Sequence, residues 1–254
     1  MTPRMWRYTV LGVGFYLIFL VITFPASWVE WGLFRYTQGM VSINGASGSL
    51  WRGTAPLVVQ LPQSSPQYLG DLSWNVNPLW LIIGRLQVHL NITAPNLQMQ
   101  GNVALSPSTI RVAQMHGKLP ASLINLYYAP AALFAPSGWL HVDIDTLAIA
   151  QGINGSIDIL WQDAGSSLSQ VNPLGDYRLH LTGEGDTTRI QVETLRGVLM
   201  LNGQGHWQWG TGQLQVNGTA KPDANSAAQV EPILKLLGPD QGGGQRAWAI
   251  NTRL

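Results

Sequence analysis

Apolar residues alternate with polar ones along most of this chain, and this period-two pattern constrains the fold more than any other feature. Successive side chains of a β-strand point to opposite faces, so an alternating run predicts a strand with one buried face. The runs cover residues 86–92, 110–112, 140–144, 153–159, 179–181, 190–192 and 214–216. The sequence therefore predicts a mainly β fold.

Four Asn-Gly pairs lie between or beside the apolar runs, at 44–45, 154–155, 202–203 and 217–218. Asn-Gly tolerates the positive φ values of the type I′ turn that joins antiparallel strands. The pairs predict hairpin turns and one large, curved antiparallel sheet, resembling a β-sandwich in its patterning. Two short helices are expected within residues 120–134 and 226–237, where the alternation stops.

The composition suits a sheet protein and excludes several classes. Only 11% of the residues are charged and 46% are hydrophobic, which rules out a disordered chain. The net charge of +1 gives no electrostatic support for binding nucleic acid. The chain has no cysteine, so disulfides, thiolate metal sites and thiol nucleophiles are excluded.

The segment from residue 8 to residue 27 contains no charged residue. Twenty residues at the helical rise span about 30 Å, the thickness of a bilayer's hydrocarbon core. Tyr8 and Trp28 stand at its ends as interfacial aromatic residues, and Arg4 and Arg7 precede it. Basic residues before a span keep that end in the cytoplasm, so the pattern predicts a single-pass inner-membrane anchor with a cytoplasmic N-terminus.

The expected organisation is a cytoplasmic tail at 1–7, a transmembrane helix at 8–27 and a periplasmic β-rich domain at 28–254. A cleaved signal peptide is the main alternative, but its nearest candidate cleavage site, Pro25-Ala26-Ser27, would place Phe24 or Pro25 where cleavage requires a small residue. A buried core helix is the other alternative.

A weak internal repeat suggests a further division of the periplasmic part. Residues 110–119 and 190–199 share apolar positions and one glycine, at Gly117 and Gly197. The similarity is either chance among glycine-punctuated strands or the mark of two related units, at about 40–138 and 139–254. The second interpretation places the two glycines at equivalent strand ends.

No set of residues with catalytic or metal-ligand spacing is found. The five histidines stand apart, with no H-x-x-x-H pattern, and are His89, His116, His141, His180 and His206. Asp143 and Asp145 share a strand face and are interpreted as a solvated face, although two carboxylates there could also bind a cation. We therefore predict no catalytic, cofactor-binding or metal site, no cofactor, and no enzymatic activity.

Seven tryptophans follow strand-like runs. They are Trp51, Trp74, Trp80, Trp139, Trp161, Trp207 and Trp209. A stripe of such rings could bind sugar or lipid, but large rings also supply the burial that a thin sheet needs. The core interpretation is favoured, above all for Trp51, Trp74 and Trp161.

Four stretches, at 45–53, 172–179, 194–207 and 218–238, occur in order along the chain. Together they resemble the type II secretion system protein N family of Gram-negative bacteria. The resemblance implies an accessory, non-ATPase component of the inner-membrane platform that exports folded proteins from the periplasm across the outer membrane. Its expected partners are other platform proteins, foremost the bitopic protein C, and no small-molecule substrate.

Gly-x-Leu-Trp-x-Gly, at 48–53, also looks like AsmA-like envelope proteins with curved antiparallel sheets. This second resemblance supports an alternative function, binding or transfer of lipid in the periplasm. It predicts an apolar groove on the inner sheet face, open at Leu179, Leu181, Ile190 and Val192.

Overall fold

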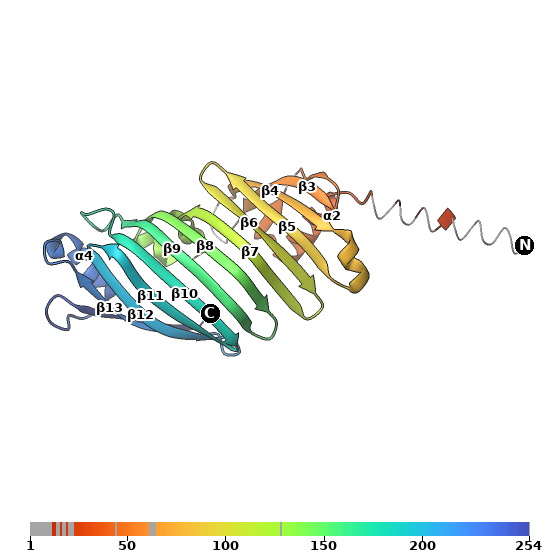
Figure 1. The fold of residues 1–254 in the computed structure, drawn as a ribbon. Coiled ribbons are helices and arrows are strands. Elements are labelled where there is room, and N and C mark those ends of the chain that lie inside the picture. The colour runs from red at the N-terminus through yellow and green to blue at the C-terminus, as the bar shows by residue number, and fades with distance from the viewer. Residues whose placement is uncertain are drawn as a thin grey trace, which may run out of the picture. The chain divides into compact units, whose positions relative to one another are not determined.

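The computed structural model describes residues 12, 13, 16, 19, 23–43, 45–60, 65–127 and 129–253. The fold is mainly β, as predicted, and the described residues form fourteen strands that pair antiparallel (Figure 1). The chain divides into two compact units, Met1–Ala94 and Pro95–Leu254.

Unit 1 is a short helix packed on a small sheet. Its elements are α2 (Ser27–Tyr36), β1 (Val41–Ile43), β2 (Ser47–Gly48), β3 (Arg52–Val59), β4 (Gln67–Asn77), the 3-10 helix η1 (Pro78–Ile83) and β5 (Leu86–Ala94). The sheet order is β1-β3-β4-β5, and β2 pairs with β3. Val29 and Leu33 of α2 pack with buried Ile43 and Trp74, which places the core between the helix and the sheet.

Unit 2 is a sheet of nine strands in chain order (Figure 1). The strands are β6 (Leu97–Ser106), β7 (Thr109–Pro120), β8 (Pro136–Ile149), β9 (Ile153–Ser166), β10 (Gly175–Gly185), β11 (Thr187–Gly197), β12 (Leu199–Gln208), β13 (Gln213–Pro222) and β14 (Arg246–Arg253). Short helices follow β7, namely η2 (Ala121–Leu123), α3 (Ile124–Tyr127) and η3 (Ala129–Leu133), and α4 (Ala227–Leu237) follows β13. Both expected helical segments are confirmed.

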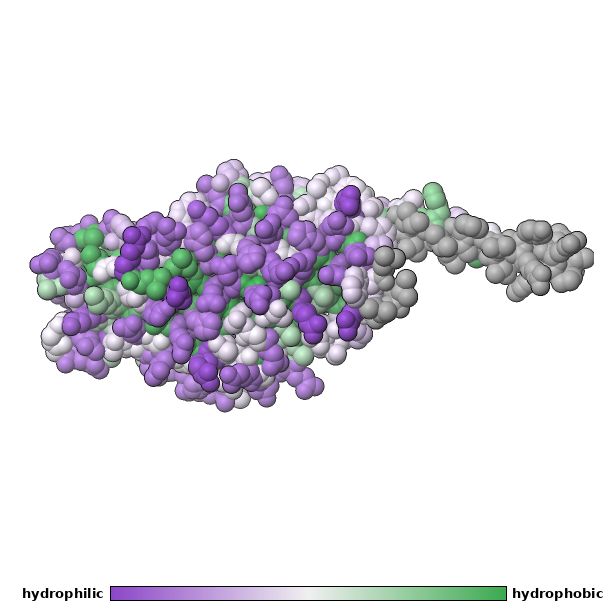
Figure 2. Space-filling model, viewed as in Figure 1, coloured by the Kyte–Doolittle hydropathy of each residue, from purple (hydrophilic) through white to green (hydrophobic). Residues whose placement is uncertain are grey.

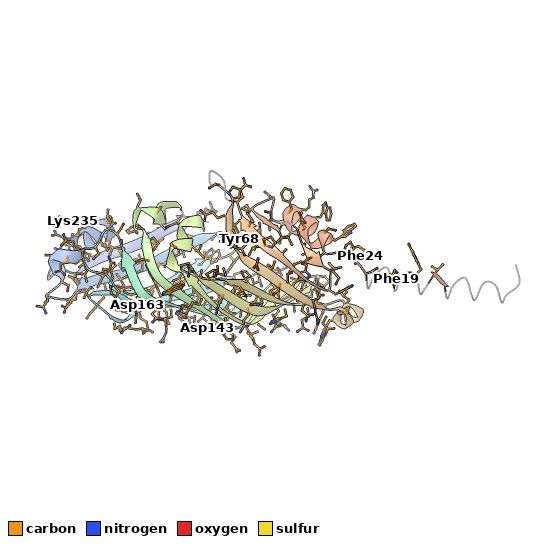
Figure 3. The ribbon with its side chains drawn as sticks, turned by 90° about the horizontal axis from the view of Figure 1, so that it is seen from above. Phe19, Phe24, Tyr68, Asp143, Asp163 and Lys235 are labelled. Carbon is orange, nitrogen blue, oxygen red and sulfur yellow. The ribbon has the colours of Figure 1, made fainter. Side chains whose placement is uncertain are left out.

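Helix α4 covers one face of the unit 2 sheet. Val230, Ile233 and Leu234 share one side of the helix because they are three and four residues apart, and all three are buried. They pack with Tyr177 and Leu199 of the sheet. Figure 3 shows Lys235 of α4 on one side of this sheet and Asp143 of β8 on the other. The viewed surface of the sheet in Figure 2 is largely hydrophilic.

Every alternating run of the sequence lies in a strand, namely in β5, β7, β8, β9, β10, β11 or β13, because successive side chains of a pleated strand point to opposite faces. The prediction that Asn-Gly pairs make the hairpin turns is wrong for three of the four pairs. Residues 154–155, 202–203 and 217–218 lie inside β9, β12 and β13. Asn44 lies outside the described residues.

These glycines serve close packing and not turns. Gly203 and Gly218 are cross-strand partners, and a Cβ on either would lie 2.7 Å or less from the ring of Trp248. A Cβ on Gly155, which has a φ of 127°, would lie 2.1 Å from the carbonyl oxygen of Thr146. Glycine is required at these places because the neighbouring strand or ring comes too close for any side chain.

Gly117 and Gly197 do not occupy equivalent places, so that prediction is wrong. Gly117 lies inside β7 and pairs with Met99 and Val142. Gly197 ends β11 with a φ of 148°, and the chain turns there into β12. A positive φ at Gly197 allows this reversal, whereas β7 continues for three residues beyond Gly117. The two repeat units at about 40–138 and 139–254 stay a prediction.

Most of the predicted membrane span at 8–27 lies outside the described residues. In the part of the chain that the structure describes, no helix has both the length and the hydropathy needed to cross a membrane. The structure adds α2, a helix that the sequence did not predict after residue 27. Glu30 in its first turn and Arg35 in its last turn complement the helix dipole.

Candidate functional site

A row of histidine and aspartate side chains crosses four strands of unit 2. His116 on β7 is opposite Asp143 on β8, Asp143 is opposite Asp158 on β9, and Asp158 is opposite His180 on β10. Nδ1 of His116 lies 2.7 Å from Oδ1 of Asp143, and Nδ1 of His180 lies 2.7 Å from Oδ1 of Asp158. Two carboxylates facing each other repel, and a hydrogen bond from one imidazole to each of them offsets this repulsion.

This row lies on a solvent-exposed face of the sheet, because the four side chains are between 37% and 60% exposed. Asp145 does not join it, since the pairing of β8 with β9 is irregular between Asp143 and Leu147. No group of three His, Asp or Glu residues among the described residues is arranged to hold a metal ion. Sequence reasoning named His116, His180 and Asp143 separately but missed Asp158, which only strand register could have found.

A second network joins two of the stretches that carry the family resemblance. Asp176, at the start of β10, accepts hydrogen bonds from the backbone N–H of Asp163, at 2.8 Å, and from Nε of Arg196 at the end of β11. Partial burial acts to raise the pKa of Asp176, but the Asp163 amide and the Arg196 guanidinium outweigh it and lower the pKa. The contacts tie β9, β10 and β11 together, so these residues are structural.

An apolar cavity of about 280 Å³ lies among the sheet, α4 and the segment after β7. Trp161 and Leu201 line it from the sheet, Leu174 from the connection before β10, Ile233 and Leu237 from α4, and Phe134 from the segment before β8. Two hydroxyl groups reach its wall. That of Tyr177 donates to the carbonyl oxygen of Leu199 at 2.8 Å, and that of Ser166 donates to the carbonyl oxygen of Phe134.

Tyr177 is one of the buried residues of the cavity wall. Tyr177 is 5% exposed, and burial raises the pKa of its phenol far above the ordinary value. Its ring centroid lies 6.0 Å from that of Trp161, which itself donates from Nε1 to the carbonyl oxygen of Ser137 at 2.8 Å. Three side chains of the cavity wall, those of Trp161, Ser166 and Tyr177, are therefore fixed by hydrogen bonds to backbone carbonyl oxygens.

Strand β14 forms an open edge. It pairs with β13 over eight residues in regular register, and among the described strands no other one pairs with it. All residues from Ala249 to Arg253 are exposed, and Ile250 is 49% exposed. Edge strands are usually protected by proline, lysine or a bulge, none of which occurs within β14.

The two arginines of β14 are held at its ends. Nη1 of Arg246 donates to the carbonyl oxygen of Gly238 at 3.3 Å, and Nε of Arg253 donates to that of Thr211 at 2.9 Å. Trp248 fixes the strand by lying over Gly218 of β13 and Gly203 of β12. These contacts hold the strand in place. The residues between the two arginines are uncharged.

The three tryptophans for which the sequence most favoured a core role do pack in the cores. Trp74 is 4% exposed and donates from Nε1 to the carbonyl oxygen of Leu50 at 3.2 Å. Trp51 and Trp161 are half-buried against the cores of their own units. Trp80 differs, because it lies in η1 and is 40% exposed.

The fold and these surfaces define a class of protein, an antiparallel β-sheet protein with an open edge strand and an apolar cavity. The model of one family, described as type II secretion system protein N, matches residues 39–249. The chain belongs to this family, which confirms the resemblance in its sequence. It is therefore a component of the type II secretion system, and membership implies a location in the cell envelope.

The match extends from just before β1 to the middle of β14, so it includes the cavity and the first four residues of β14. No curated protein matches the chain, and no solved structure does either. The family is described as one of type II secretion system components.

Proposed function

We propose that this protein scaffolds the inner-membrane platform of the type II secretion system by adding a strand of another platform protein to β14. Protein C is the partner expected from the resemblance. The observation that carries the proposal is the open edge from Ala249 to Arg253, which leaves backbone N–H and C=O groups available to an incoming strand.

The arrangement of β14 supports strand addition as the mode of binding. Ile250 lies on the same strand face as Trp248, and it is cross-strand partner to buried Val216. A partner strand that places an apolar side chain beside Ile250 would extend this apolar row and bury it. Backbone pairing supplies affinity in such contacts, and alternate side chains supply specificity.

The proposal includes the topology expected from the sequence. Residues 8–27 anchor the chain in the inner membrane, residues 1–7 lie in the cytoplasm, and residues 28–254 lie in the periplasm. The support is the uncharged stretch, with Arg4 and Arg7 before it. Unit 2 would then meet its partners on the periplasmic side.

Replacing Ile250 by lysine is expected to reduce secretion at least tenfold while the protein level stays normal. A lysine at this edge would have to lose water when a partner strand is added, which disfavours pairing without disturbing the folded chain. Secreted protein in the medium of a complemented deletion strain measures the effect. Leu195→Lys is the matched control, because Leu195 is 45% exposed and lies on β11, away from the edge.

The control variant is expected to secrete within twofold of the wild type. Equal secretion by Ile250→Lys and the wild type would contradict the scaffold proposal at this edge. An equal loss of secretion in both variants, with both proteins stable, would show that the β14 edge has no specific role in secretion.

A second candidate function, binding of lipid, is favoured by one specific observation. The cavity beside α4 is apolar, and Leu179, Leu181 and Val192 on the inner face of the same sheet are only half-buried. Ile190 is the exception, since it is 7% exposed. These side chains support the groove that the alternative function predicts.

A further inference from the structure

The wall of the cavity offers nothing to a polar ligand. Its two hydroxyl groups, from Ser166 and Tyr177, already donate to the carbonyl oxygens of Phe134 and Leu199. The other described side chains that line it are apolar, including Trp161, Leu201 and Ile233. A ligand that fills this space therefore has to be free of hydrogen-bonding groups over the buried part of its length.

This requirement distinguishes a hydrocarbon chain from a peptide. A peptide segment brings one N–H and one C=O with almost every residue, and each of them costs free energy if it is buried without a partner. Ordered water could not bridge them, because water itself needs two or more polar partners in the wall. The chemistry of the lining therefore favours an alkyl chain.

The size of the cavity and its continuation favour a linear ligand over a compact one. The volume of about 280 Å³ is roughly twice that of the ~150 Å³ engineered cavity that takes up benzene. From Trp161, the same strand face continues with Ile159 and Ile157 on β9, opposite Leu179 and Leu181 on β10. These four side chains are half-buried. They extend the apolar surface by about 14 Å along the strand.

From these observations we infer that the cavity binds one acyl chain of a membrane phospholipid, and that this acyl chain continues from the cavity along the apolar face of β9 and β10. The head group stays outside, since no charged side chain lines the cavity among the described residues. The cell envelope, implied by the family, supplies phospholipid as the abundant source of such chains. The inference rests on the second function proposed above and is independent of the scaffold function.

The test uses the full-length protein in phosphatidylethanolamine–phosphatidylglycerol vesicles. The probe is a phosphatidylethanolamine that carries a diazirine near the end of one acyl chain. After irradiation, mass spectrometry locates the labelled peptides. We expect label on the peptides that contain Leu174, Leu201 and Ile233, in addition to any label within residues 1–27.

Leu201→Trp is expected to reduce the cavity label at least fivefold, because the larger ring fills the space. Ile110→Trp is the matched control, since Ile110 lies on β7 outside the cavity and is 37% exposed, and its label is expected to equal that of the wild type. If Leu201→Trp does not fold, Leu237→Phe fills the cavity from α4 and is expected to act in the same way.

Cavity label that persists in a folded filling variant would overturn the inference. Label found only elsewhere on the sheet would also overturn it, while leaving lipid binding as a function of the protein. Label restricted to residues 1–27 would overturn both the inference and the second proposed function. None of these results bears on the scaffold function, which is tested at β14.

Discussion

Replacing Trp74 by alanine is expected to lower the free energy of unfolding by about 3–5 kcal/mol. Trp74 is 4% exposed, and its Nε1 donates to the carbonyl oxygen of Leu50. Its ring fills the space beside Gly53, where a Cβ would lie only 2.3 Å from Cζ2 of the ring. The alanine variant loses this packing and leaves a cavity in the core of unit 1, so degradation in the cell should follow.

Thermal melting of the purified protein measures the effect. A loss of this size is expected to lower the melting temperature by about 10 °C or more for unit 1. Trp80→Ala is the control, because Trp80 is 40% exposed, and its melting temperature should stay within a few degrees of the wild type. Equal melting temperatures for Trp74→Ala and the wild type would refute the core role and favour a ligand-binding role for the ring.

Replacing Gly218 by alanine is expected to cost about 3 kcal/mol, at the upper end of the usual range for overpacking. A Cβ at this place would lie 2.3 Å from the carbonyl oxygen of Asn202 and 2.4 Å from the ring of Trp248. The first contact is with backbone, so no side-chain rotation relieves it. Strand β14 should therefore loosen, and secretion should fall together with stability.

Gly210→Ala is the matched control for this change. A Cβ on Gly210, in the turn between β12 and β13, meets nothing within 4 Å, so its effect should stay within about 0.5 kcal/mol. Denaturant melts of both variants give the comparison. A Gly218→Ala protein as stable as the Gly210→Ala protein would show that Trp248 and β14 are held loosely.

The strands could be predicted from the sequence because their signal is local. In runs such as 86–92 and 140–144, alternate residues face a core, and this periodicity is visible as alternating apolar and polar residues in the sequence. The helix α4 could be predicted for the same reason. Helix α2 could not, since its core contacts Val29 and Leu33 stand among exposed aromatic residues that also suit a membrane interface.

The side-chain pairs on the sheet and the cavity depend on which residues of neighbouring strands lie opposite each other. This register cannot be derived from a single sequence. Asn-Gly suggested turns because it tolerates positive φ, yet Gly203 and Gly218 are needed for the ring of Trp248, which lies 30 residues beyond Gly218 in the sequence. The His116–Asp143 and His180–Asp158 pairs likewise arise from register. The cavity combines residues from nine elements or connections, so no local sequence pattern predicts it.

Site-specific photocrosslinking in living cells tests the scaffold function most directly. A photoreactive amino acid is placed at Ala249 or Asn251 of β14, or at Leu195 of β11 as the control, and captured proteins are identified by mass spectrometry. Ala249 and Asn251 are exposed on the open edge, whereas Leu195 belongs to β11, which pairs with both β10 and β12 through residues 187–192. The scaffold function predicts that both β14 positions capture the same component of the type II secretion system and that Leu195 captures none. Capture of that component from Leu195, with none from β14, would contradict it.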